Sequence, residues 1–342
     1  GLTPELPLDV VATLDDLSFA HLMAQFEVTE TAIVEWIFDG EMHLAGSLRD
    51  LELAGPIDLS TRDFVVSLDS YDVRPVRPVI AIPRGRFTGR WSIRDDAVRF
   101  HDLVGELPQS RLSGGEVLLG FHNDLRVEAH AEGSLAEITP LAGFSIAGVG
   151  HADCHIDGVF QDPRVTGHLD FDGFEFDGMR FGDIVTDATL DRDGFGVTFP
   201  LATATRRDSR YAVHDLYLDF HHDRFALDGR LDLARLTLAD FYDVFSLEGD
   251  ERFSPYQGVT RGTVAIRYTN GFPGDSDSGT LRTIASLDFD TISLSGYAFD
   301  RGHFEGAFDW LDWSRGASGA TLTIDEGVFH KGEGTVVVAG EM

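Results

Sequence analysis

Apolar and polar residues alternate along most of the chain. In the stretch GHLDFDGFEFDGMRFGD (167–183), Phe171 and Phe176 stand next to Asp170 and Asp177. Successive side chains of a β-strand point to opposite faces of a sheet, so this pattern predicts a strand with one apolar and one acidic face. Similar stretches that end at Gly, Asp or Asn predict roughly 18 to 20 strands, joined by short turns into antiparallel meanders.

Short helices are expected between groups of strands. A Leu-x-x-Leu/Ile-Ser/Thr marker occurs at Leu14–Ser18, Leu135–Thr139 and Leu233–Thr237. After the first and third markers, FAHLMAQF (19–26) and LADFYDVF (238–245) have apolar residues at helical spacing. These two segments are therefore predicted to be helical.

The chain also matches itself in two ungapped alignments. His43–Leu59 aligns with His155–Phe171, with identities at 43/155, 46/158, 50/162, 55/167 and 58/170. Leu169–Asp183 aligns with Leu287–Arg301, including Phe171 with Phe289. With the markers, these alignments predict one continuous repeat array with approximate units 1–134, 135–232 and 233–342. Because the chain does not begin with Met, we expect it to be a fragment of a larger protein.

Composition excludes some partners. The chain has 58 acidic and 27 basic residues, so its formal charge of −31 would repel nucleic acid and anionic membrane surfaces. Lys331 is its only lysine, and Cys154, its only cysteine, has no partner for an internal disulfide. The sequence has neither a transmembrane-length apolar run nor an opening signal peptide.

Three segments resemble metal sites only superficially. HADCHID (151–157) places two His and two Asp on one strand face, but ligands two residues apart splay, and Cys154 falls in the apolar phase. HHD (221–223) is interpreted as a hairpin turn. PGDSDSG (273–279) lacks the distant Glu of a calcium loop. We predict no metal and no cofactor.

No catalytic residues are predicted. The sequence contains no nucleophile elbow, no phosphate-binding glycine loop and no paired Ser/His/Asp pattern. Trp310 and Trp313 flank a turn, where edge packing explains them as well as carbohydrate stacking does. A polysaccharide-processing enzyme is the weakest hypothesis, because no carboxylate pair stands out.

The apolar strand faces leave two architectures open. Two packed sheets would bury these faces in each other. One sheet of this many strands, each about 4.8 Å wide, would run on the order of 90 Å and would have to curl. Periodicity alone favours a packed sandwich or solenoid. The large residues at most apolar strand positions shift the balance toward a trough with an apolar lining.

A resemblance to a known family sharpens this picture. Residues 155–199 contain the pattern Gly158-x-Phe160-x-Asp162-Pro163-x-Val165-x-Gly167-x-Leu169, followed by Phe174, Phe176, Phe181, a charged turn and another strand. This pattern resembles the repeat of the TamB and AsmA-like proteins, and 287–309 repeats its second half. The likeness covers most of the chain, although the Asp-Pro segment is clear in one copy.

The resemblance implies an all-β, elongated and twisted β-taco, a sheet folded lengthwise around a hydrophobic groove, with short helices between repeats. Its implied function is passive: a periplasmic bridge segment, anchored in the inner membrane in the full-length protein, that carries phospholipid acyl chains between inner and outer membranes, with a possible link to outer-membrane protein assembly. Inner- and outer-membrane components would be its partners through parts missing from this fragment. The alternative is a secreted or surface adhesin-like β-solenoid or sandwich array that binds glycan or protein.

The residues expected to line the groove share the apolar phase of their strands. They are Val165, Leu169, Phe171, Phe174, Phe176, Phe181, Leu216, Leu218, Phe220, Phe225, Leu227, Leu231, Val264, Ile266, Leu287, Phe289, Ile292, Leu294 and Phe304.

Overall fold

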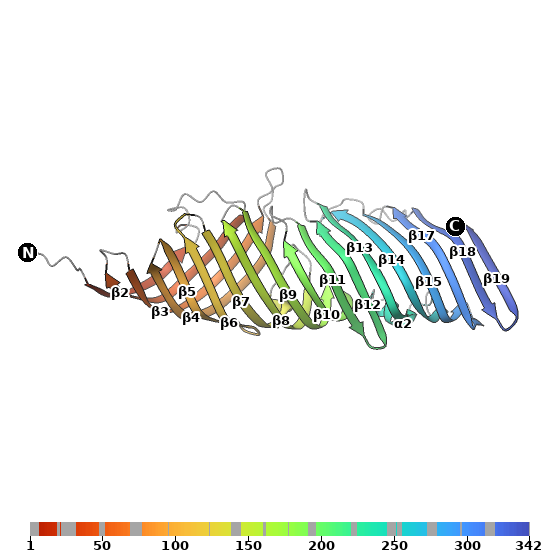
Figure 1. Ribbon diagram of the computed structural model, residues 1–342, viewed down its shortest axis with the longest axis horizontal. Coiled ribbons are helices and arrows are strands. Elements are labelled where there is room, and N and C mark those ends of the chain that lie inside the picture. Colours follow the sequence, from red (N-terminus) through yellow and green to blue (C-terminus); the bar gives the residue numbers. More distant parts are fainter. Residues whose placement is uncertain are drawn as a thin grey trace, which may run out of the picture. The chain divides into compact units, whose positions relative to one another are not determined.

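The computed structural model describes most of the chain as strand. The described residues are 7–18, 21, 32–47, 52–68, 77–94, 96–122, 124–137, 145–159, 162–176, 178–190, 196–219, 224–244, 251, 255–271, 279–294, 296–311 and 319–341. They fall into two compact units, Gly1–Leu169 with Thr189–Gly194 (unit 1) and Asp170–Ala188 with Phe195–Met342 (unit 2). Figure 1 shows the strands of each unit side by side in chain order.

Unit 1 is an antiparallel meander. Its strands are β1 (Pro7–Ser18), β2 (Ala32–Ser47), β3 (Glu52–Leu68), β4 (Arg77–Arg94), β5 (Ala97–Glu106), β6 (Arg111–Gly120), β7 (Asp124–Ser134), β8 (Ile146–Val159) and the first half of β9 (Asp162–Phe176). A short 3-10 helix, η1 (Leu135–Glu137), follows β7. From β1 to β8 each strand pairs with the next one in the chain.

Unit 2 continues the same connectivity. It holds the end of β9, most of β10 (Met179–Leu190), β11 (Gly196–Arg206), β12 (Ser209–Asp219), β13 (Arg224–Thr237), β14 (Gln257–Gly271), β15 (Thr280–Leu294), β16 (Tyr297–Phe299), β17 (Arg301–Leu311), β18 (Gly319–Lys331) and β19 (Gly334–Glu341). The short β16 pairs with β15, which also pairs with β17. The helix α2 (Leu238–Val244) follows β13.

Burial of side chains along a strand alternates with the same period of two as the apolar and polar residues in the sequence. In β3, Leu53, Ile57 and Leu59 are buried, whereas Ala54 and Asp58 are exposed. One face of the strand therefore packs, and the other meets water, as the alternation predicts.

Bulges shift this alternation at a few positions. In β12, Val213 and Leu216 lie three residues apart, and the register against β13 shifts between His214 and Tyr217. Asp215, between them, has a φ of 50°. A bulge inserts an extra residue and changes which face the following side chains occupy. The two residues between Val213 and Leu216, where alternation would leave one, thus reflect a bulge and not a break in the strand.

The predicted secondary structure is largely confirmed. The described residues form 19 strands, and the strand pairs described above are antiparallel. The described part of the chain is therefore nearly all β. The predicted helix at 238–245 corresponds to α2, while most of 19–26 lies outside the described residues. Among the described residues, no helix has the length and apolarity needed to cross a bilayer. The predicted repeat units 1–134, 135–232 and 233–342 remain a prediction.

Candidate functional site

The sheet of unit 2 has one apolar face, whose side chains form rows across the strands. Residues directly opposite each other in antiparallel neighbours share a face of the sheet. We call the following rows, together with Phe289 and Phe329, the unit 2 apolar face: Leu218, Leu227, Tyr268 and Leu281; Val213, Leu231, Val264 and Ala285; Tyr211, Leu233, Gly262, Leu287 and Phe304.

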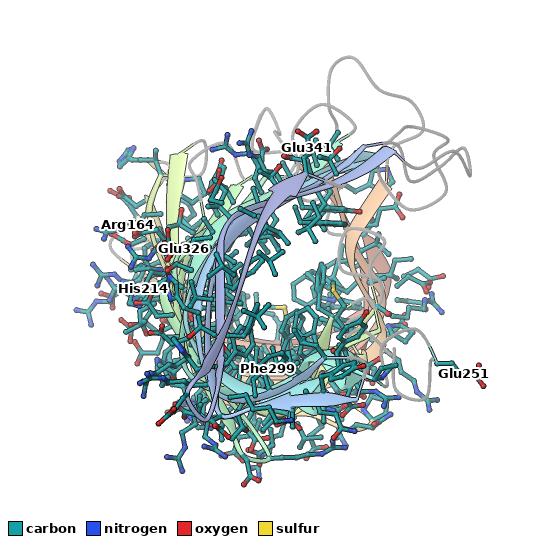
Figure 2. The ribbon with its side chains drawn as sticks, turned by 90° about the vertical axis from the view of Figure 1, so that its right-hand side faces the viewer. Arg164, His214, Glu251, Phe299, Glu326 and Glu341 are labelled. Carbon is teal, nitrogen blue, oxygen red and sulfur yellow. The ribbon has the colours of Figure 1, made fainter. Side chains whose placement is uncertain are left out.

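The opposite face of the same strands carries charges. Arg267 Nη2 lies 2.7 Å from Asp228 Oδ2, and His303 Nδ1 lies 2.8 Å from Asp288 Oδ1. Figure 2 shows Phe299 on the inner side of the strands of unit 2, whereas His214 and Glu326 point outward. The apolar and charged faces are thus cleanly separated.

One aromatic contact indicates that unit 2 curls toward its apolar face. The rings of Phe176 in β9 and Phe225 in β13 have centroids 6.0 Å apart, although β10, β11 and β12 separate their strands. In a flat sheet, four steps would put these strands about 19 Å apart. Phe225 also contacts Tyr268 in the directly paired strand β14, with ring centroids 6.0 Å apart, which extends the aromatic contact by one strand. Side chains from distant strands therefore meet over the inner face.

The apolar face is half-buried rather than sealed. Only sixteen apolar side chains of the described residues are buried. A sandwich that packed all its apolar faces together would bury more of them.

Phenylalanine rings crowd two glycines of β17. A Cβ added to Gly302 would come within 2.6 Å of the ring of Phe329 in the adjacent strand β18, and one added to Gly306 within 2.8 Å of the ring of Phe304 in β17 itself. Each ring thus occupies the space that a neighbouring side chain would need. Phenylalanine rings therefore cover the backbone of the apolar face at these two glycines.

Unit 1 has an apolar face of its own. Leu53, Ile57, Leu59 and Trp91 form its buried cluster, and half-buried apolar residues from β1, β2, β4 and β5 pack against them. Trp91 satisfies its ring N–H by donating to the His43 carbonyl at 2.9 Å. This packing resembles that of unit 2 in kind, with few residues fully enclosed.

None of the described residues predicted to line a groove is exposed. Phe171, Phe225, Phe289 and Ile292 are buried, and the other fourteen are half-buried. Phe220 lies outside the described residues. Val165 and Leu169 belong to unit 1 and the rest to unit 2. Their role as a lining remains a prediction.

The HADCHID segment lies in β8, with Asp153 and His155 exposed. Asp153 Oδ1 lies 2.6 Å from His130 Nδ1 in β7, and the hydrogen bond and charge of this pair raise the pKa of His130 and lower that of Asp153. Cys154 is half-buried, and burial raises the pKa of its thiol. Asp153 and His155 thus pair across strands with His130 and Glu128 of β7.

The other segments weighed as metal or carbohydrate sites are mostly not described by the structure. His221–Asp223, Trp313 and nearly all of 273–279 lie outside the described residues. Among the described residues, one group of three potential metal ligands has its ligand atoms within 4.8 Å of one another: Asp15, Asp16 and Asp39. Arg62 contacts both Asp16 and Asp39, so a positive charge already compensates this group.

An ionic cluster under α2 was missed by sequence reasoning. Asp243 is buried and contacts Arg206, while Arg207 lies 3.2 Å from it. Hydrogen bonding and charge from Arg206 lower the pKa of Asp243. Asp240 is also buried, and its carboxylate accepts a 2.5 Å hydrogen bond from Ser209.

The start of α2 carries the signal that could have revealed this cluster. Thr237 Oγ1 accepts a hydrogen bond from the Asp240 N–H at 3.1 Å, as an N-cap residue does. Thr237-x-x-Asp240 has the spacing of a capping box. Next to it, burial raises the pKa of Tyr211 to about 12, and its hydroxyl donates to the Phe181 carbonyl. The contacts of Asp243 with Arg206 and of Asp240 with Ser209 fix α2 against β11 and β12.

Comparison of the chain with known protein families, with curated proteins and with solved structures found no match.

Proposed function

We propose that this chain is a segment of a lipid-carrying bridge of the TamB and AsmA-like kind, in which the curled apolar face of unit 2 forms part of a hydrophobic groove. The contact between Phe176 and Phe225 carries the proposal, because it brings strands four positions apart around one apolar surface. In this proposal the groove holds phospholipid acyl chains, and the head groups stay in water.

The physical argument concerns the half-buried surface. Removing apolar surface from water contributes about 25 cal/mol per Å², so a face left half-exposed gains stability when hydrocarbon covers it. Extended apolar surfaces of this kind commonly mark interaction sites. The separation of charges onto the outer face keeps such a segment soluble while its inner face remains apolar.

Location and partners rest on the resemblance alone. In this proposal the chain works in the periplasm and belongs to a protein that connects inner and outer membranes. Transport in this proposal would need no catalytic residue.

The test is native mass spectrometry and phospholipid uptake on two variants of β15. Leu287 lies on the apolar face and is half-buried, whereas Ile284 is 52% exposed on the other face of the same strand. Leu287→Asp places a charge where acyl chains would lie. We expect it to weaken uptake of a fluorescent phospholipid about tenfold or more, which corresponds to a loss of at least ~1.4 kcal/mol.

Ile284→Asp is the matched control and should keep wild-type uptake. Circular dichroism and thermal unfolding establish that both variants remain folded. Wild-type protein that carries no lipid and takes up none would refute the proposal. Equal uptake by both variants would show that this face is not where lipid binds.

The adhesin-like alternative predicts a different outcome of the same experiment. A protein that stays lipid-free, but is retained on immobilised glycan or on a protein ligand, would favour that alternative.

A further inference from the structure

Two histidines and two carboxylates share one face of the β7–β8 pair in unit 1. His130 of β7 is directly opposite Asp153 of β8, and Glu132 is directly opposite His151. Residues paired in this way, and residues two apart on one strand, lie on the same face of a sheet. The rings of His130 and His151 have centroids 5.9 Å apart. We call these four residues the β7–β8 histidine group.

His130 and Glu132 already stand at the separation of two ligands of one metal ion. His130 Nε2 lies 3.4 Å from Glu132 Oε1. Two ligand atoms that each lie about 2.0–2.1 Å from a tetrahedral Zn²⁺ are about 3.3 Å apart. Imidazole nitrogen and carboxylate oxygen are both usual ligands of zinc. The side chains of His130 and Glu132 are 37% and 71% exposed, so an ion reaches them without any opening of the sheet.

Asp153 orients the ring of His130 for such a site. Asp153 Oδ1 lies 2.6 Å from His130 Nδ1. An ionised carboxylate only accepts hydrogen bonds, so Nδ1 is the donor, and in the neutral ring the lone pair is left on Nε2. Metal-binding histidines commonly donate their other ring N–H to a carboxylate, which fixes the ring orientation. The pair of Asp153 and His130 has this form.

His151 supplies the third ligand from the neighbouring strand. It lies directly opposite Glu132, where Cβ atoms are about 4.5–5.5 Å apart. Two imidazoles on one tetrahedral zinc ion have ring centroids about 5 Å apart, close to the 5.9 Å between His130 and His151. The three ligand atoms do not all lie within 4.8 Å of one another in the structure, so the side chain of His151 has to rotate toward the other two.

Unit 2 contains the same arrangement without its second histidine. His303 of β17 is directly opposite Asp288 of β15, and Glu305 is directly opposite Ser286. His303 Nδ1 lies 2.8 Å from Asp288 Oδ1, and Nε2 lies 3.5 Å from Glu305 Oε1. Ser286 thus takes the place that His151 has in unit 1. The chain therefore carries its own reference group, in which one ligand is missing.

We propose that His130, Glu132 and His151 bind one zinc ion, with Asp153 as a positioning residue for His130. The fourth coordination position is left to water. Sequence reasoning predicted no metal here because ligands two residues apart on one strand splay, whereas these ligands come from two paired strands. The bound ion joins β7 to β8, and its binding does not depend on lipid.

The test is calorimetric titration of Zn²⁺ into protein freed of metal with a chelator, in the presence of excess Mg²⁺. Mg²⁺ prefers oxygen ligands and occupies the acidic surface, while imidazole ligands suit zinc. Wild-type protein should bind one zinc ion per chain. His151→Ser makes the group in unit 1 a copy of that in unit 2 and should weaken zinc binding about tenfold or more.

Unit 2 supplies the matched controls. His303→Ala removes the corresponding histidine of the incomplete group and should leave zinc binding unchanged. Ser286→His completes that group and should raise the stoichiometry to two zinc ions per chain. Circular dichroism and thermal unfolding establish that each variant remains folded.

The role of Asp153 has a readout of its own. Asp153→Ala should weaken zinc binding about 10–100-fold, as loss of a carboxylate behind a metal-binding histidine commonly does. Asp153→Asn keeps an oxygen that accepts from Nδ1 and should restore part of the affinity. In ¹⁵N NMR spectra of the zinc-free protein, the neutral ring of His130 should be protonated at Nδ1 in wild type and at either nitrogen in Asp153→Ala.

An NMR titration locates the ion without any substitution. Zinc should shift the imidazole signals of His130 and His151 before those of His303. A wild-type protein that takes up no zinc even at millimolar concentration would overturn the proposal. Zinc binding by His151→Ser as tight as that of wild type, or equal losses in His151→Ser and His303→Ala, would overturn it as well.

Discussion

Individual side chains on the outer face act mainly as cross-strand ion pairs. Arg86 binds both carboxylate oxygens of Asp58, at 2.8 and 2.6 Å, and this pairing lowers the pKa of Asp58. His303 and Asp288 form a similar pair between β17 and β15. Exposed pairs of this kind contribute little to stability, about 0–1 kcal/mol each, but they fix which strands lie opposite each other.

The pair of His303 and Asp288 leads to a titration prediction. A hydrogen bond to Asp288 raises the pKa of His303 above its ordinary value, with a smaller contribution from Glu305. Protonated His303 is therefore favoured in the folded state. Its contribution to stability is complete below about pH 6.5 and disappears as pH rises through the folded-state pKa.

An NMR titration of the imidazole signals measures this effect. Asp288→Asn should lower the pKa of His303 toward its ordinary value and leave that of His130 raised, because His130 pairs with Asp153 in the other unit. A His303 pKa that does not change in Asp288→Asn would show that the observed pairing is not maintained in solution.

At the scale of strands, glycines allow neighbouring backbones to approach closely at bulges. Gly262 combines a φ of 141° with a backbone oxygen 2.1 Å from where a Cβ would be. A non-glycine residue there has to adopt a strained conformation and displace β15. The bulge that follows Leu233 depends on this position.

Gly262→Ala should therefore destabilise the protein by more than about 2 kcal/mol, since a backbone conformation of this kind costs about 1–3 kcal/mol before any clash is counted. Chemical denaturation of unit 2 measures the change. Gly319→Ala is the control, because an added Cβ there meets nothing within 4 Å, and it should be near neutral. Similar losses in both variants would contradict the role assigned to Gly262.

The strands themselves could be predicted from sequence, because alternation in segments such as Leu53–Thr61 reports directly on two faces. The helix at α2 was also predictable from its apolar spacing. A single sheet of this length was expected to curl, but the specific contact of Phe176 with Phe225 was not predictable, because it depends on twist accumulated over several strands. The cluster of Asp243 with Arg206 was hidden for a similar reason: its members are 37 residues apart and lie on different elements.

At the scale of the whole chain, charge is the dominant feature. A formal charge of −31 generates self-repulsion that opposes the folded state. Salt at about 1 M shortens the screening length to about 3 Å and relieves this repulsion. The outer ion pairs are weakened too, but each contributes little.

Added sodium chloride should therefore raise the thermal midpoint, by roughly 2–4 °C for each kcal/mol of relieved repulsion. Glycerol at equal concentration is the uncharged control. A midpoint that falls as salt is added would show that the ion pairs outweigh the net repulsion.

The pairing of nearly every strand with its neighbour in the chain has a consequence for how the protein forms. Contacts between adjacent hairpins close only short loops, so the contact order is low for a β protein and the entropic barrier to folding is small. A strand needs only its predecessor in place before it can add to the sheet. The chain is thus suited to vectorial folding, one hairpin after another, while its remainder is still being delivered.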